Sequence, residues 1–121
     1  MAAGRYDLAI EQGATFTRDC TWQNSNGTPV DLTNYTITGK LRRRASDKVA
    51  LVSFTCTVTS ALLGQFSFSL TAAQTASLPT AQSNNAEKEL LECVYDIEAT
   101  TGSTVDRLME GIAYISPEVT K

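Results

Sequence analysis

Alternation of apolar and polar residues with a period of two is the feature that most constrains how this chain can fold. The clearest case is residues 52–58, where Val52, Phe54, Cys56 and Val58 alternate with serine and threonine. Successive side chains of a β-strand point to opposite faces, so such a segment buries one face and exposes the other. We therefore expect the chain to fold from half-buried β-strands.

The same alternation recurs along the chain, between short turns rich in Gly, Asn, Asp and Ser. Strands are predicted at residues 6–10, 14–22, 35–43, 52–58, 66–70, 91–98 and 105–116. A short helix is predicted at residues 71–79, capped by Thr71 and ended by Pro79, with Leu78 closing one end of the fold. About seven antiparallel strands with connections of Greek-key length predict an all-β, immunoglobulin-like two-sheet β-sandwich.

The connection between the second and third predicted strands is the segment around which the others are arranged. Its residues 24–27 (Asn-Ser-Asn-Gly) tolerate positive φ, and Pro29 fixes its own φ and restricts the residue before it. Val30 and Leu32 then alternate with polar residues that can hydrogen-bond the local backbone. We expect a rigid crossover from one sheet to the other, without a reactive group.

The last predicted strand is apolar on both faces. Its alternating positions carry Leu108, Ile112 and Tyr114 on one face, and Met109, Ala113 and Ile115 on the other. Such a strand is central in its sheet, contains a bulge, or has an outer face covered by a partner. Gly39, inside the third strand, predicts either a bulge or the close approach of another backbone.

Length and charge limit the classes of function. A chain of 121 residues is one domain, predicted to span residues 1–121, with 42% hydrophobic and 19% charged residues. The net charge of −3 argues against a general nucleic-acid binder. One basic run occurs, Arg42, Arg43 and Arg44. It is interpreted first as charge guarding an edge strand, with a nucleic-acid contact and an ion-pair contact with an acidic protein as alternatives.

Cysteine content and the absence of targeting signals bear on location. Cys20, Cys56 and Cys93 are odd in number and lie in predicted strands as small buried hydrophobes. A bridge between Cys20 and Cys93 would imitate antibody domains, but Trp22 and Leu91 do not fit that pattern, so free thiols are favoured. The apolar stretches are too short for a membrane helix, and residues 1–5 lack a secretory core. Synthesis in a cytoplasm is expected.

The sequence offers no recognisable catalytic or metal-binding pattern. It contains no histidine, no Cys-x-x-Cys spacing and no glycine-rich phosphate loop. Glu92, Asp96 and Glu98 share one strand face, where a solvated surface is favoured over a cation site because the carboxylates are too far apart to converge. We expect no enzyme activity and no cofactor.

Three segments in order carry a resemblance to a known family. They are EQGATF at residues 11–16 after the strand at 6–10, PVDLTNYT at residues 29–36, and a closing hairpin with YDIE at 95–98, VDRLMEG at 105–111 and SPEVT at 116–120. This set resembles small immunoglobulin-like structural proteins of tailed bacteriophages, and is similar to the amino-terminal domain of upper baseplate proteins of lactococcal phages. The family usually has Gly where this chain has Asn34.

The resemblance implies a virion component that binds other virion proteins in multiple copies, without catalytic residues. A tail position, as a baseplate or tail-fibre adaptor component, is favoured over decoration of the capsid. The long polar segment at residues 80–88 leaves open whether the partner surface is the same. Neither nucleic acid nor a membrane is expected among the partners.

Candidate contact residues are the basic run, the terminal residues 1–5 and 116–121, and the pair Leu62 and Leu63 at a predicted turn. Two adjacent leucines at a β-turn cannot both enter the core, so either one is buried or both serve as contacts. A carbohydrate-binding or host-adhesion module on the same fold is the main alternative, and it would need an accessible Trp22. A small enzyme inhibitor or chaperone subunit is a further alternative.

Overall fold

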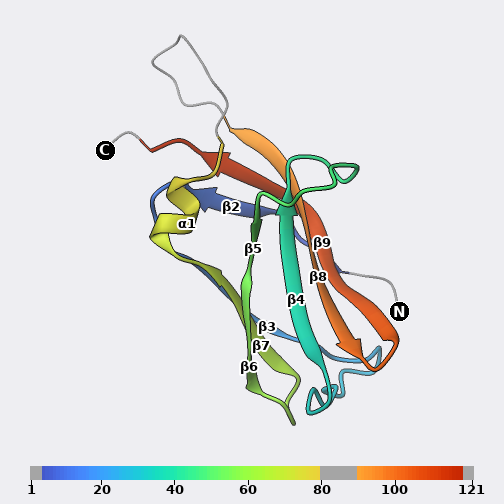
Figure 1. Ribbon diagram of the computed structural model, residues 1–121. Coiled ribbons are helices and arrows are strands. Elements are labelled where there is room, and N and C mark those ends of the chain that lie inside the picture. Colours follow the sequence, from blue (N-terminus) through green and yellow to red (C-terminus); the bar gives the residue numbers. More distant parts are fainter. Residues whose placement is uncertain (1–3, 80–89, 119–121) are drawn as a thin grey trace.

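The computed structural model describes residues 4–79 and 90–118, and its regular secondary structure is β-strand apart from one short helix (Figure 1). The elements in chain order are β1 (Gly4–Arg5), β2 (Leu8–Glu11), β3 (Phe16–Thr21), β4 (Thr36–Arg42), β5 (Val52–Ser53), β6 (Thr55–Ser60), β7 (Gln65–Leu70), α1 (Ala72–Ala76), β8 (Leu91–Thr101) and β9 (Thr104–Ser116). Within these residues no helix is long and apolar enough to cross a membrane.

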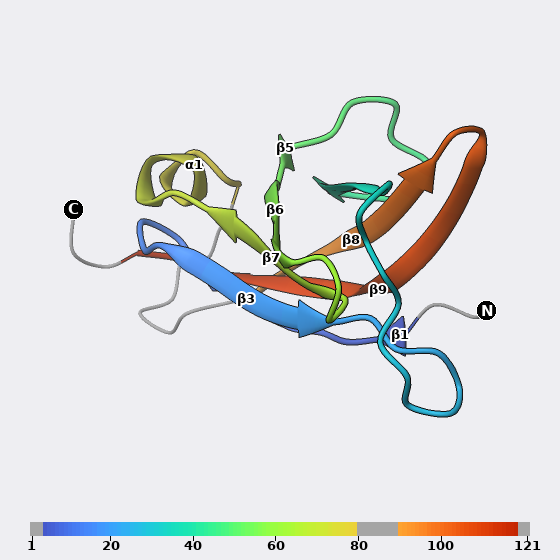
Figure 2. The same cartoon turned by 90° about the horizontal axis from the view of Figure 1, so that it is seen from below.

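The strands form two sheets, which confirms the predicted all-β sandwich. The larger sheet has the order β1-β9-β8-β4-β5, with β2 also paired to β9, and the smaller has the order β3-β7-β6. Neighbouring strands are antiparallel except β1 and β2, which run parallel to β9. Seen from below, β8 and β9 form a long bent hairpin that extends beyond the smaller sheet (Figure 2).

Two of the predicted strands differ in the structure. The first, predicted at residues 6–10, corresponds to β2 alone, because Tyr6 and Asp7 lie outside any strand and β1 precedes the predicted range. The fourth begins in the larger sheet as β5 and continues in the smaller sheet as β6, with Phe54 between them donating its backbone N–H to Gly39 O at 2.9 Å. A period of two shows that a segment is extended but not which strand it pairs with, so the change of sheet was not predictable from alternation.

The core lies between the two sheets and is built from the inward positions of the predicted strands. Four aromatic rings pack together at its centre, with Phe54 and Phe68 edge to face at 5.2 Å and Phe16 and Tyr95 beside them. Gly39 makes a close approach without a register shift, because a Cβ there would meet the Ile97 side chain. The bulge interpretation is therefore wrong, and the approach is closest to a side chain, with the Asp96 backbone oxygen 3.1 Å from that Cβ position.

The short helix closes one end of the sandwich, as predicted. Thr71 and Gln74 form a capping box, and Leu78 is buried. The Thr75 hydroxyl accepts from the Gly13 N–H at 3.0 Å and donates to Ala14 O at 2.8 Å. These bonds fasten α1 to the turn between β2 and β3.

The crossover from β3 to β4 joins the two sheets, as expected. Gly27 turns the chain with φ of +86°, and the Asp31 carboxylate accepts from the Thr33 N–H at 2.9 Å. Leu32 is buried, and its N–H donates to Ala61 O at 2.9 Å. The crossover is thus held both by its own turns and by the turn between β6 and β7.

Candidate protein-interaction surfaces

The turn between β6 and β7 presents two exposed leucines on a well-supported backbone. Leu62 is 74% exposed and Leu63 is 52% exposed, so the interpretation in which one of them is buried is wrong. The flanking Gly64 has φ of +67°, and its N–H donates to Ala61 O at 3.1 Å. Its carbonyl accepts from Trp22 N at 2.8 Å, which ties the turn to the end of β3.

The close packing of this turn against the rest of the backbone requires a glycine at its last position, Gly64. A Cβ at Gly64 would lie 2.5 Å from Trp22 O and 2.8 Å from Val30 O, both of them backbone atoms. The turn therefore packs directly against the crossover, and this close packing fixes its position relative to both sheets. The two leucines are held in place by backbone contacts while their own side chains face solvent.

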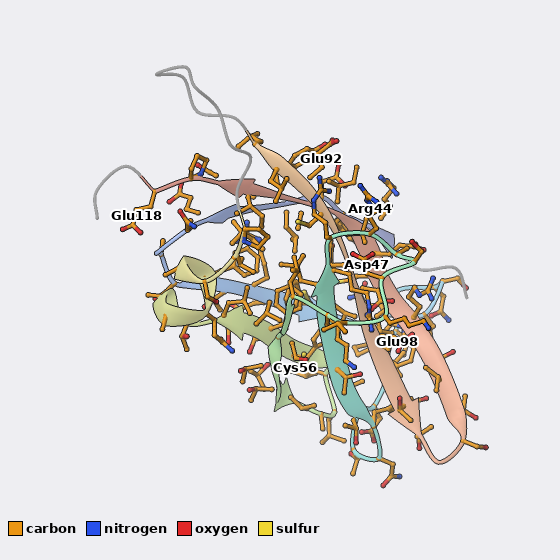
Figure 3. The ribbon with its side chains drawn as sticks, turned by 45° about the horizontal axis from the view of Figure 1, so that its top comes forward. Arg44, Asp47, Cys56, Glu92, Glu98 and Glu118 are labelled. Atoms are coloured by element: carbon orange, nitrogen blue, oxygen red, sulfur yellow. The ribbon has the colours of Figure 1, made fainter. Side chains whose placement is uncertain are left out.

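The basic run does not form one patch and does not lie on an edge strand. β4 lies between β8 and β5 in the sheet order, so the edge-strand interpretation of Arg42, Arg43 and Arg44 is wrong. Arg42 is half-buried and its Nε donates to Asp47 O at 3.1 Å. Arg43 lies beyond the strand and its Nη1 donates to Glu92 O at 2.6 Å. Arg44 is exposed on the connection from β4 to β5, where Figure 3 labels it together with Asp47.

A charged recess lies on the outer face of the larger sheet, where β4, β8 and β9 meet beside β1. Its volume is ≈ 330 Å³, and the charged residues that line it are Arg5, Lys40, Arg42, Asp96, Arg107 and Glu110. Arg107 pairs with Asp96 at 3.6 Å and with Glu110 at 3.9 Å. Of these residues the sequence indicated only Arg5 and Arg42 as contacts, because the others come from strands whose pairing the sequence does not reveal.

A second groove lies at the edge of the sandwich, between β1 of the larger sheet and β3 of the smaller. Its volume is ≈ 610 Å³, and Tyr6, Trp22, Gln23 and Asn24 are among the residues that line it. Tyr6 is 59% exposed. Trp22 is partly buried and packs edge to face on Tyr35, with ring centroids 5.3 Å apart.

The described parts of the two terminal segments are paired within the molecule. Gly4 and Arg5 form β1 against Met109 and Glu110 of β9. At the other end, the Glu118 N–H donates to Gln12 Oε1 at 3.0 Å. Residues 1–3 and 119–121, and the polar segment at 80–88, lie outside the described residues, so their predicted roles stay predictions.

The three cysteines are free, and Cys20 contacts the Met109 sulfur at 3.6 Å. Burial, with a smaller effect from the nearby Cys20, raises the pKa of the Cys56 thiol to about 11. This thiol is therefore almost entirely protonated at neutral pH, the unreactive form. Figure 3 labels Cys56 on β6, within the smaller sheet.

The acidic residues of β8 do not converge. Glu92 is exposed, whereas Asp96 is engaged by Arg107 in the recess, and Figure 3 shows Glu92 and Glu98 well apart along the strand. Across residues 4–79 and 90–118, no group of three or more His, Cys, Asp or Glu side chains is placed to hold a metal ion.

The topology defines the chain as an immunoglobulin-like β-sandwich domain whose candidate sites are surfaces. No family model matches it, and no curated protein does. Among solved structures it is similar to the NK cell receptor Nkp44, described as a triggering partner in natural cytotoxicity, with 15% identity and a TM-score of 0.43. The match covers 98% of this chain and 100% of the receptor chain. A TM-score this low carries no argument about function, and the resemblance to phage proteins stays a prediction.

Proposed function

We propose that the chain is a non-enzymatic structural protein of a tailed bacteriophage virion, assembled in multiple copies into the tail at the baseplate or a fibre adaptor. The observation that carries the proposal is the exposed pair Leu62 and Leu63 on a rigidly supported turn. A large apolar side chain gains about 1.5–3 kcal/mol when it is buried, so two adjacent exposed leucines favour contact with another protein. The three phage-like segments, together with the absence of histidine, support the same proposal.

The proposal is tested by changing both leucines to serine. In the Leu62→Ser/Leu63→Ser variant we expect assembly to weaken by at least about tenfold, because each leucine removed from an interface forfeits about 1.5–3 kcal/mol. The melting temperature should fall by less than about 4 °C, since neither side chain packs in the core. Assembly is followed by immunogold labelling of purified virions and by the mass of the protein in solution.

A matched control removes two other exposed apolar side chains. Val49 is 79% exposed and Leu90 is 55% exposed, so Val49→Ser/Leu90→Ser changes a similar exposed area away from the turn. The proposal is supported if immunogold label is found at the tail tip with the unmodified protein and the control, and is lost only with Leu62→Ser/Leu63→Ser. Label over the capsid replaces the tail assignment with decoration, and absence of label from virions overturns the structural role altogether. A large fall in melting temperature would place the leucines in the core.

The groove between β1 and β3 favours a second candidate function, carbohydrate binding or host adhesion. Aromatic rings pack on the apolar faces of sugars, and amide groups pair with their hydroxyls, so the combination of Tyr6 and Trp22 with Gln23 and Asn24 suits such a ligand. If this function holds, a glycan array shows binding that Tyr6→Ala abolishes and that Val105→Ala, at an exposed residue outside the groove, preserves. If the unmodified protein binds no glycan, or if Tyr6→Ala and Val105→Ala bind equally well, the carbohydrate-binding function is excluded.

A further inference from the structure

The recess on the outer face of the larger sheet has a surplus of positive charge that the rest of the chain lacks. Four cationic side chains line it against two carboxylates, which leaves a surplus of two positive charges. Because the whole chain carries −3, the remainder of the molecule carries −5. The positive charge is thus concentrated at one place on an otherwise acidic protein.

Not all of this positive charge is neutralised within the recess. Arg107 forms ion pairs with both carboxylates of the recess, at 3.6 Å to Asp96 and 3.9 Å to Glu110. Arg42 bonds a backbone oxygen, and Arg5 lies 3.9 Å from Asp7. The Lys40 side chain is exposed and makes no ion pair or hydrogen bond within residues 4–79 and 90–118. Lys40 and Arg42 thus remain available to an external anion.

The spacing of these two cations indicates the shape of the occupant. Lys40 and Arg42 are two residues apart on β4 and face the same side, with buried Leu41 between them facing the core. Alternate residues of a strand are about 7 Å apart along the chain. Carboxylates at alternate positions of a second extended chain have the same repeat. A volume of ≈ 330 Å³ is near the lower end of ligand pockets, about 300–1,000 Å³, and suits a few side chains.

We propose that the recess formed by Arg5, Lys40, Arg42 and Arg107 binds an extended acidic segment of a neighbouring protein, with its carboxylates at alternate positions. The inference deepens the proposed assembly role by naming the chemistry of one partner. It explains why the cations of β4, β9 and β1 are gathered on one sheet face, since opposite charge across an interface sets register and specificity. It needs no contribution from Leu62 and Leu63.

The test measures binding of a fluorescein-labelled peptide of alternating aspartate and serine to the purified chain by fluorescence anisotropy. We expect saturable binding at 50 mM salt that Lys40→Glu weakens by at least about tenfold and that 0.5 M salt abolishes, because exposed charges are screened. Lys48→Glu is the matched control, since it makes the same charge change at an exposed residue outside the recess. Its affinity should stay within about twofold of the original.

Further arms decide between occupants. A peptide of the same composition with its aspartates in one block should bind more weakly, and equal affinity would overturn the extended-segment assignment. Inorganic phosphate at millimolar concentration should not displace the alternating peptide, and displacement would assign the recess to a free anion. Lys40→Gln provides a second variant if Lys40→Glu does not fold. Equal affinities for the Lys40 and Lys48 variants, or no peptide binding, overturn the proposal.

Peptide binding is measured on the isolated chain and therefore does not depend on the virion experiment. If virions carry no label but the peptide binds, the recess stands and the phage assignment fails. If the label is found at the tail and the peptide does not bind, the assembly role stands and the acidic partner fails.

Discussion

At the scale of single residues, three positions connect the first strands to the last. Gly111 on β9 has no side chain, and a Cβ there would meet the Tyr6 carbonyl oxygen. Tyr95, its cross-strand partner on β8, is buried and donates its hydroxyl to the same carbonyl. The Tyr6 backbone thus occupies the space that the glycine leaves, and the hydrogen bond from Tyr95 holds the junction between β1 and β2.

Removal of this hydroxyl should be visible in both stability and its pH dependence. Tyr95→Phe is expected to lower the free energy of unfolding by about 1 kcal/mol at pH 7, the usual value of one hydrogen bond, measured by urea denaturation. Burial, followed by the nearby Cys20, raises the pKa of Tyr95 from 10.0 to about 12. Its protonated hydroxyl therefore stabilises the fold fully below pH 10, and this contribution is lost as the pH rises to 12.

The Tyr95→Phe variant should lack this loss of unfolding free energy between pH 10 and 12. It should keep the loss of stability that ionisation of Cys56 causes between pH 9.0 and about 11. Tyr114→Phe is the control, because its hydroxyl makes no hydrogen bond within the described part of the chain. If the free energy of unfolding of Tyr95→Phe falls above pH 10 as steeply as that of the unmodified protein, the stabilising role assigned to the Tyr95 hydroxyl is wrong.

At the scale of elements, the sequence predicted which segments are strands better than it predicted their partners. Alternation located β4, β7 and β8, whose alternate residues are buried, and also β6, although no residue of β6 is fully buried. It could not show that the segment around Phe54 leaves one sheet and enters the other. The parallel pairing of β2 with β9 joins residues more than a hundred positions apart, and no local pattern encodes it.

The candidate sites also differ in whether local sequence or long-range strand pairing creates them. Leu62 and Leu63 were recognisable from sequence because two adjacent apolar residues at a turn conflict with burial, although only the structure shows that both are exposed. The recess was not recognisable, since Lys40 and Arg107 come together only through the pairing of β4, β8 and β9. The last strand is central in the sheet order and also contains a bulge opposite Ile97 and Glu98, so two of the three interpretations of its apolar faces are confirmed, and an outer face covered by a partner stays a prediction.

At the scale of the whole molecule, the fold is closed by its two ends. β2 lies parallel to β9, with Leu8 opposite Ala113 and Ile10 opposite Ile115. Leu8 is 4% exposed and Ile10 is fully buried, so β2 completes the core and covers what would otherwise be a free edge of β9. We therefore expect the short strand β2 to contribute strongly to the stability of the entire sandwich.

This closure predicts a large difference between two double substitutions in β2. Leu8→Ser/Ile10→Ser should lower the free energy of unfolding by about 3–6 kcal/mol, since each buried side chain contributes about 1.5–3 kcal/mol. A typical domain has only about 5–15 kcal/mol in total, so this variant should be largely unfolded or prone to aggregate through β9. Ala9→Ser/Glu11→Ser changes the exposed positions of the same strand and should melt within a few degrees of the unmodified protein. Thermal unfolding followed by circular dichroism separates the two, and equal melting temperatures would show that β2 does not close the molecule.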